Sequence, residues 1–209
     1  NVLRITLLIS LPSGIGLSVL AKPILKMFYD PFVVQVAGPQ LEVLGISVVF
    51  ICLVAPINAM LQAMGRADVP AKIVLVGGAV KLFLNIVLVL NPRINVIGSA
   101  YSTVACYTIM VILSFVFLKR IMGMKLRWRS IFLKPLFATV CCSTAAWAVN
   151  GILSRFVSNS ISVLSAISVA VFVYIWALLS IRAVKREDVL MLPKGQKIAQ
   201  ILEKYDWIG

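Results

Sequence analysis

The 209-residue sequence contains no histidine and only seven acidic residues, and 13% of its residues carry a charge. A soluble domain of this length would need more charge, because its surface must face water. Without histidine, a serine or cysteine nucleophile would lack its usual base. The composition therefore argues against a soluble protein and against an enzyme with catalytic residues, and no cofactor is expected.

Carboxylates are also missing from the middle of every apolar block. They lie at block ends, in turns or in the C-terminal tail, at Asp30, Glu42, Asp68, Glu187, Asp188, Glu203 and Asp206. The sequence thus offers no paired intramembrane carboxylates and no clear cation site. The four cysteines (Cys52, Cys106, Cys141 and Cys142) lie inside apolar blocks. Small buried hydrophobic side chains are their first interpretation, and a disulfide or metal site is the second.

What the sequence does have is apolar blocks, since 61% of its residues are hydrophobic. Blocks of about 20 residues match a hydrocarbon core of about 30 Å. The candidate spans are about 3–27, 43–64, 71–90, 97–118, 132–153 and 161–181. The sequence therefore predicts an all-α, polytopic membrane helix bundle with about six transmembrane helices. Pro12 and Pro56 should each free a backbone carbonyl and kink their helices.

The positions of the basic residues predict the topology. With six spans, 15 of the 20 lysines and arginines fall on one side, four fall on the other, and Lys81 lies within a span. Positive charge is enriched on the cytoplasmic side, so both termini are expected there, in a multi-pass protein of the cell membrane that contacts membrane lipids. The net charge of +13 does not indicate nucleic acid, because the basic residues sit at block ends and form no water-exposed face.

Two polar pairs lie inside predicted spans and form the candidate substrate-binding residues. Lys81 and Asn85 are one helical turn apart, and Gly77 and Gly78 nearby should let a neighbouring helix approach closely. A charge there costs at least about 2.5–3.5 kcal/mol, so Lys81 is either anchored by packed helices or contacts an anionic substrate. Asn58 and Gln62 are the second pair, and such amides commonly join helices.

The tail after residue 181 has a different pattern. Ile198, Ile201, Leu202 and Tyr205 recur with helical spacing, opposite a polar face. A short amphipathic helix is expected, either on the cytoplasmic membrane surface or docked against the bundle.

Four stretches resemble a known superfamily. They are residues 61–66, residues 78–85 with their glycine, lysine and asparagine, residues 95–103 and residues 187–195. The chain resembles the C-terminal half of a polysaccharide or lipid-linked oligosaccharide flippase of the multidrug/oligosaccharidyl-lipid/polysaccharide exporter superfamily, nearest the stage V sporulation protein B family. Position 99 is serine where that pattern has alanine.

The resemblance implies the last six helices of a transporter of about 14, so an N-terminal lobe of the same protein is an expected partner. The implied division is 1–120 as the end of the second lobe, 121–183 as two additional helices, and 184–209 as a cytoplasmic tail. The implied function is movement of a lipid-linked anionic saccharide or cell-wall precursor, as in polysaccharide biosynthesis or sporulation. The alternatives are a drug or cation antiporter of the same superfamily and a non-transporting membrane scaffold.

Overall fold

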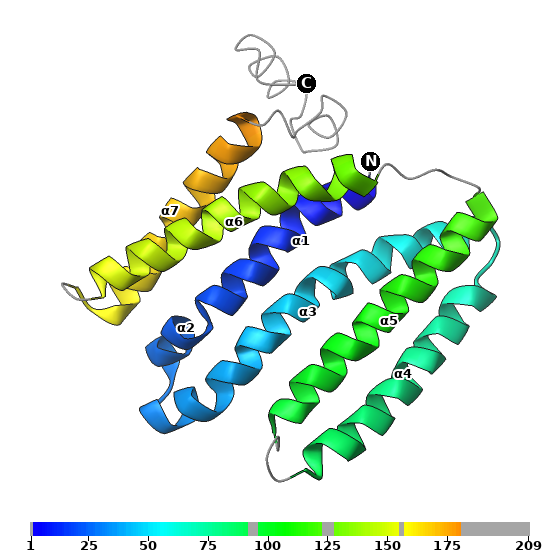
Figure 1. The fold of residues 1–209 in the computed structure, drawn as a ribbon, viewed down its shortest axis with the longest axis horizontal. Coiled ribbons are helices and arrows are strands. Elements are labelled where there is room, and N and C mark those ends of the chain that lie inside the picture. The colour runs from blue at the N-terminus through cyan, green and yellow to red at the C-terminus, as the bar shows by residue number, and fades with distance from the viewer. Residues whose placement is uncertain (1, 92–95, 123–127, 155–156, 181–209) are drawn as a thin grey trace. The chain divides into compact units, whose positions relative to one another are not determined.

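The computed structural model of the protein describes residues 2–91, 96–122, 128–154 and 157–180. In these ranges the chain is helical and has no strand (Figure 1). The helices are α1 (Val2–Val19), α2 (Ala21–Phe28), α3 (Pro31–Ala63), α4 (Asp68–Val89), α5 (Ile97–Met122), α6 (Trp128–Leu153) and α7 (Asn159–Ser180). All except α2 are long and apolar enough to cross a membrane. The predicted all-α bundle with about six spans is confirmed.

The chain divides into two compact units. One consists of the chain up to Pro12 together with the residues from Arg127 onward, and the other of Ser13–Leu126. The first unit therefore contains α6, α7 and the beginning of α1, whereas the second contains the end of α1 and α2–α5. The predicted division at residues 120 and 183 stays a prediction, and the predicted tail helix lies outside the described residues.

Two helices differ in extent from the predicted spans. The first span, predicted as residues 3–27, is interrupted at Leu20, and the short α2 follows it. α3 begins at Pro31, 12 residues before the predicted span, and its 33 residues extend for about 50 Å. Proline suits the first position of a helix because its missing N–H would be unpaired there anyway. Hydropathy marks where a chain enters hydrocarbon, whereas a helix can continue past that boundary.

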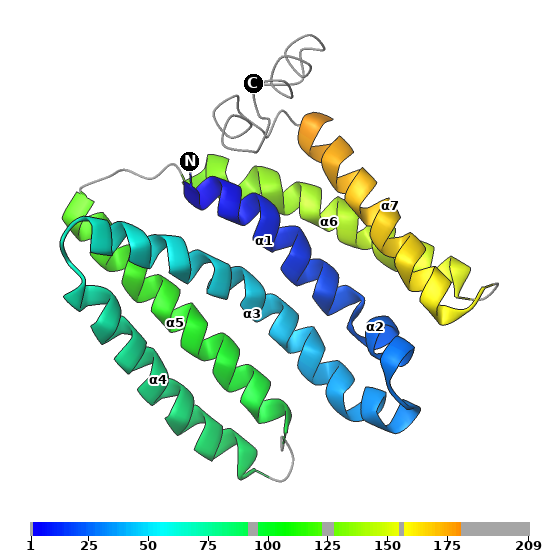
Figure 2. The ribbon, with the colours of Figure 1, turned by 180° about the vertical axis from the view of Figure 1, so that it is seen from behind.

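The early part of α3 is held against the α1–α2 corner. Lys22 Nζ lies 3.0 Å from Glu42 Oε1, and Ser18 Oγ donates a 2.7 Å hydrogen bond to the Glu42 carbonyl oxygen. Within the second unit, Figures 1 and 2 show α3, α5 and α4 side by side in this order. α5 therefore packs on both α3 and α4, which contact each other only slightly.

Small residues set the distance between α1 and α3. A Cβ atom added to Gly14 would lie 2.7 Å from the Gly45 carbonyl oxygen and 2.9 Å from Val49 Cγ2. A Cβ atom added to Gly45 would in turn lie 2.8 Å from the Gly14 carbonyl oxygen. Such contacts bring two backbones together in a way that larger side chains prevent, as is common between helices in membranes.

In the unit with α6 and α7, small side chains also line the helix seam. Thr139, Ala146, Ser162 and Ala166 are all at most 1% exposed. Ser162 Oγ of α7 lies 3.1 Å from Asn150 Oδ1 of α6 and donates a hydrogen bond to it. The seam thus combines close backbone approach with an interhelical hydrogen bond, both of which favour helix association in lipid.

Two glycines of α1 allow a matched test of the α1–α3 contact. Gly14→Ala should destabilise the protein, because overpacking costs about 1–3 kcal/mol. Gly16→Ala is the control, since a Cβ atom at Gly16 meets nothing within 4 Å. It should be neutral or stabilising by up to about 1 kcal/mol through helix propensity. Thermal unfolding in detergent measures both, and equal melting temperatures for the two variants would contradict the close contact.

Candidate functional site

Lys81 is the charged residue deepest within α4. Thirteen residues separate it from Asp68 and eight from Val89, which places it about 20 Å from the start of the helix and about 12 Å from its end. Lys81 is half-buried, and the next two side chains, Leu82 and Phe83, are each 67% exposed. The charge therefore lies at the border between the packed face of α4 and its open apolar face.

The packed face of α4 touches α5 through a glycine. A Cβ atom added to Gly77 would lie 2.5 Å from Met110 Cγ and 3.4 Å from Cys106 Sγ. Gly78 differs from the expectation, because a Cβ atom there would meet nothing within 4 Å. Only the first glycine of the pair thus provides a close helix approach. Lys81 follows Gly77 by one turn, so it lies on the side of α4 that faces α5.

Asn85 adds a polar atom one turn beyond Lys81. Its Oδ1 atom is buried and has no hydrogen-bond partner among the residues that the structure describes. Lys81, one turn away, therefore does not donate to this atom. A shielded amide oxygen without a donor is unfavourable, since it has lost water and gained nothing in return. It is suited to accept a hydrogen bond from a further group.

Asn58 and Gln62 have different surroundings. Ser114 Oγ of α5 is fully buried and donates a 3.3 Å hydrogen bond to Asn58 Oδ1 of α3. Gln62 is exposed in the last turn of α3. Asn58 lies about 8 Å before the end of α3, whereas Lys81 lies about 20 Å into α4. The four predicted residues thus occupy two levels of the bundle, with Lys81 and Asn85 deeper than Asn58 and Gln62.

The turn between α3 and α4 is closed by a glycine. Gly65 has φ of 74°, which favours glycine because other side chains clash in this region. Gly65 N donates to the Gln62 carbonyl oxygen, and Arg66 N donates to the Leu61 carbonyl oxygen. These two bonds form a Schellman motif, which satisfies carbonyls that the helix end would leave unpaired. The glycine of the 61–66 stretch therefore has a structural reason.

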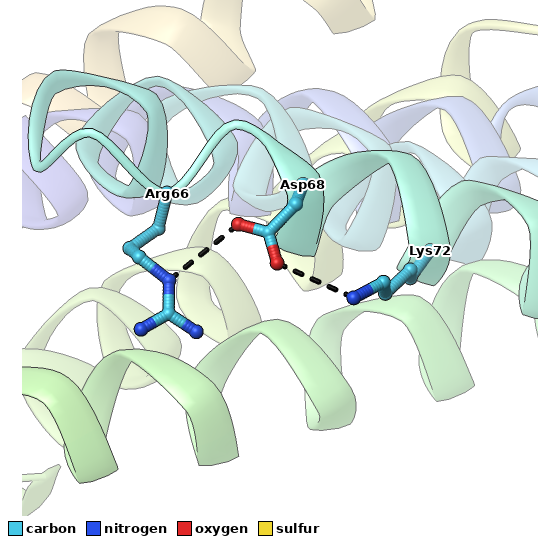
Figure 3. Close-up of polar contacts among 3 residues, drawn as sticks. All are labelled: Arg66, Asp68 and Lys72. Carbon is cyan, nitrogen blue, oxygen red and sulfur yellow. Dashed lines mark hydrogen bonds and ion pairs between the residues drawn. The ribbon is translucent and has the colours of Figure 1, made fainter.

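Charged side chains of this turn form an exposed cluster, shown in Figure 3. Asp68 accepts from Arg66 Nε at 3.5 Å and from Lys72 Nζ at 3.3 Å. All three side chains are about half exposed or more, so solvent weakens these ion pairs. The carboxylate of Asp68 also lies in the first turn of α4, where the helix dipole favours negative charge.

Two contacts were not predicted from the sequence. Ser114 lies 56 residues from Asn58, and Tyr174 donates a 2.6 Å hydrogen bond to the carbonyl oxygen of Leu8. A serine or tyrosine in an apolar block gives no indication of its distant partner. The sequence contains a weak indication of the Gly14–Gly45 contact, because the small residues Ser10, Gly14 and Ser18 recur every four residues.

Comparison with known proteins adds the family. The model of the family described as lipid II flippase MurJ matches residues 1–183. The chain belongs to the lipid II flippase MurJ family. This membership supports the resemblance to a flippase of the exporter superfamily. Together with the six apolar helices, it makes the chain a multi-pass membrane protein. The description of the MurJ family names a transport activity and no catalytic one, which is consistent with the prediction that the chain is not an enzyme.

A curated relative of this MurJ family chain is the uncharacterized membrane protein MJ1068 of Methanocaldococcus jannaschii. It is 25% identical over 138 residues, which make up 65% of this chain and 27% of that protein. The chain thus spans about a quarter of the length of this relative. The likeness to stage V sporulation protein B stays a prediction.

Proposed function

We propose that the chain is part of a flippase that moves a lipid-linked anionic saccharide or cell-wall precursor across the cytoplasmic membrane. The family match over residues 1–183 carries this proposal. Within this class of substrates, the resemblance to stage V sporulation protein B implies the precursor of a polysaccharide. Transport would require the N-terminal lobe of the same protein, with two lobes rocking about a central site to give alternating access.

Lys81 and Asn85 are the residues that we propose for substrate binding. A pyrophosphate that enters a low-dielectric cavity needs cationic partners, because an unpaired buried charge is costly. Lys81 supplies an ammonium group within the span, and the Asn85 amide has an oxygen without a donor in the described structure. That oxygen would accept a hydrogen bond from a saccharide hydroxyl or orient Lys81 when substrate enters.

Asn58 and Gln62 are weaker candidates for the same role. The hydrogen bond from Ser114 supports Asn58 as a contact that joins α3 and α5. Gln62 is exposed and close to the charged turn of Arg66, Asp68 and Lys72, so it would meet a substrate only near that end of the bundle. We therefore rank Lys81 and Asn85 first.

Two other functions make different predictions. A drug or cation antiporter of the same superfamily would need an intramembrane carboxylate, and in α4 the acidic residue is Asp68 in the first turn. A non-transporting scaffold would tolerate Lys81→Leu, because its partners would bind to loops or to the tail. Neither alternative gives a reason for a lysine within α4.

The proposed topology places both termini and the α3–α4 turn in the cytoplasm and the α2–α3 turn outside. Tyr29 and Ala67 are both exposed and lie in these two turns. In intact cells, a membrane-impermeant maleimide should label Tyr29→Cys but not Ala67→Cys, and permeabilised cells should show both. The parent protein measures the background from native cysteines. Labelling of Ala67→Cys in intact cells would overturn the topology.

The role of Lys81 is tested by flipping of a labelled lipid-linked saccharide in vesicles that contain the full-length protein. Lys81→Gln should reduce the rate about tenfold or more, since a hydrogen bond to a charged group contributes about 1.5–3 kcal/mol. Lys81→Arg keeps the charge and should retain part of the activity. Lys72→Gln is the matched control, because it removes an exposed lysine from the same helix. Wild-type rates for Lys81→Gln would leave Lys81 as a packing residue.

A further inference from the structure

Pro12 leaves one carbonyl group of α1 without its backbone hydrogen-bond donor. Helix α1 continues from Val2 to Val19 through this proline. Proline has no N–H, so the carbonyl oxygen four residues earlier, that of Leu8, loses its backbone donor. In hydrocarbon no water replaces that donor, and an unsatisfied carbonyl there is costly. A proline in such a helix is tolerated when a neighbouring helix supplies a replacement.

Tyr174 of α7 supplies the replacement. Its hydroxyl group donates a 2.6 Å hydrogen bond to the Leu8 carbonyl oxygen, across 166 residues of sequence. The tyrosine is packed against a buried apolar cluster of Leu8, Ala138, Ala177 and Leu178. Its position is therefore fixed by contacts with α1, α6 and α7, and the hydroxyl is directed at the one carbonyl that the proline deprives of its usual donor.

Three other hydroxyls of α6 and α7 bond within their own helices, unlike those of Tyr174 and Ser162. Ser143, Thr144 and Ser168 donate to carbonyl oxygens three or four residues earlier in their own helices. Those carbonyls already have backbone donors, so these hydrogen bonds add little to contacts between helices. The hydrogen bond from Tyr174 instead joins α7 to α1, at the carbonyl group that lacks a backbone donor.

The boundary between the two compact units falls at the same place. Pro12 is the last residue of α1 that belongs with α6 and α7, and Ser13 is the first that belongs with α2–α5. Helix α1 thus lacks one backbone hydrogen bond at the residue where the division between the units falls in the sequence. Prolines are among the recognised causes of sharp helix bends, and a missing bond lowers resistance to bending.

We propose that Pro12 is a pliable point of α1 and that Tyr174 is the positioning residue that holds the helix in one conformation there. Tyr174 acts through the Leu8 carbonyl and needs no contact with substrate. When the hydroxyl is removed, the carbonyl is left unsatisfied and α1 can sample other bend angles. When the proline is replaced by a residue with an N–H, the carbonyl regains its backbone donor and no longer needs Tyr174.

A double substitution in the full-length protein tests the coupling. Tyr174→Phe should lower the melting temperature in detergent by about 2 °C or more. In the Pro12→Ala background the same substitution should change it by less than half as much, because the carbonyl is already paired. Tyr101→Phe, at an exposed tyrosine of α5, is the control and should leave the melting temperature unchanged. An equal loss in both backgrounds, or no loss in either, would overturn the proposal.

The bending itself is measured by the distance between two spin labels in lipid nanodiscs. Leu75→Cys on α4 and Trp147→Cys on α6 provide exposed attachment points, one in each unit. Tyr174→Phe should broaden the distance distribution, and Pro12→Ala should narrow it. If Tyr174→Phe does not accumulate, the Pro12→Ala result alone decides. An unchanged distribution in Pro12→Ala would mean that α1 does not bend at this proline.

Discussion

Within hydrocarbon, each backbone N–H and C=O needs a partner inside the protein, and the rest of this structure depends on how that need is met. Helices meet it along most of the chain, so the sequence is organised as apolar blocks of spanning length. Internal prolines break the pattern at Pro12, Pro39, Pro56 and Pro135. At Pro12 the structure shows the compensation directly, because Tyr174 donates to the freed carbonyl of Leu8.

The hydrocarbon of the bilayer also determines how the helices pack. Lipid tails are as apolar as leucine, so burial of large side chains gives little driving force for association. Close backbone approach and interhelical hydrogen bonds take its place. The contact between Gly14 and Gly45, that between Gly77 and Met110, and the hydrogen bond from Ser114 to Asn58 are examples within one unit.

The sequence predicted the features that depend on local composition and missed those that depend on distant partners. Block length and charge at block ends predicted six spans, and the structure has six helices long and apolar enough to cross a membrane. Helix spacing also placed Lys81 and Asn85 one turn apart on α4, but it could not show that Asn85 Oδ1 lacks a donor. Hydropathy did not predict the extension of α3 back to Pro31, because residues 31–42 contain glutamines and a glutamate that end the apolar block.

The proposed role of Lys81 in substrate binding requires that its edge of α4 faces a polar interior while the neighbouring Leu82 faces lipid. Single cysteines at these two positions in the full-length protein, treated in bilayers with a charged thiol reagent that needs water, test it most directly. We predict that Lys81→Cys reacts well above the background of the parent protein and that Leu82→Cys does not. Equal reactivity at the two positions, or none at position 81, would contradict a polar interior along this side of α4.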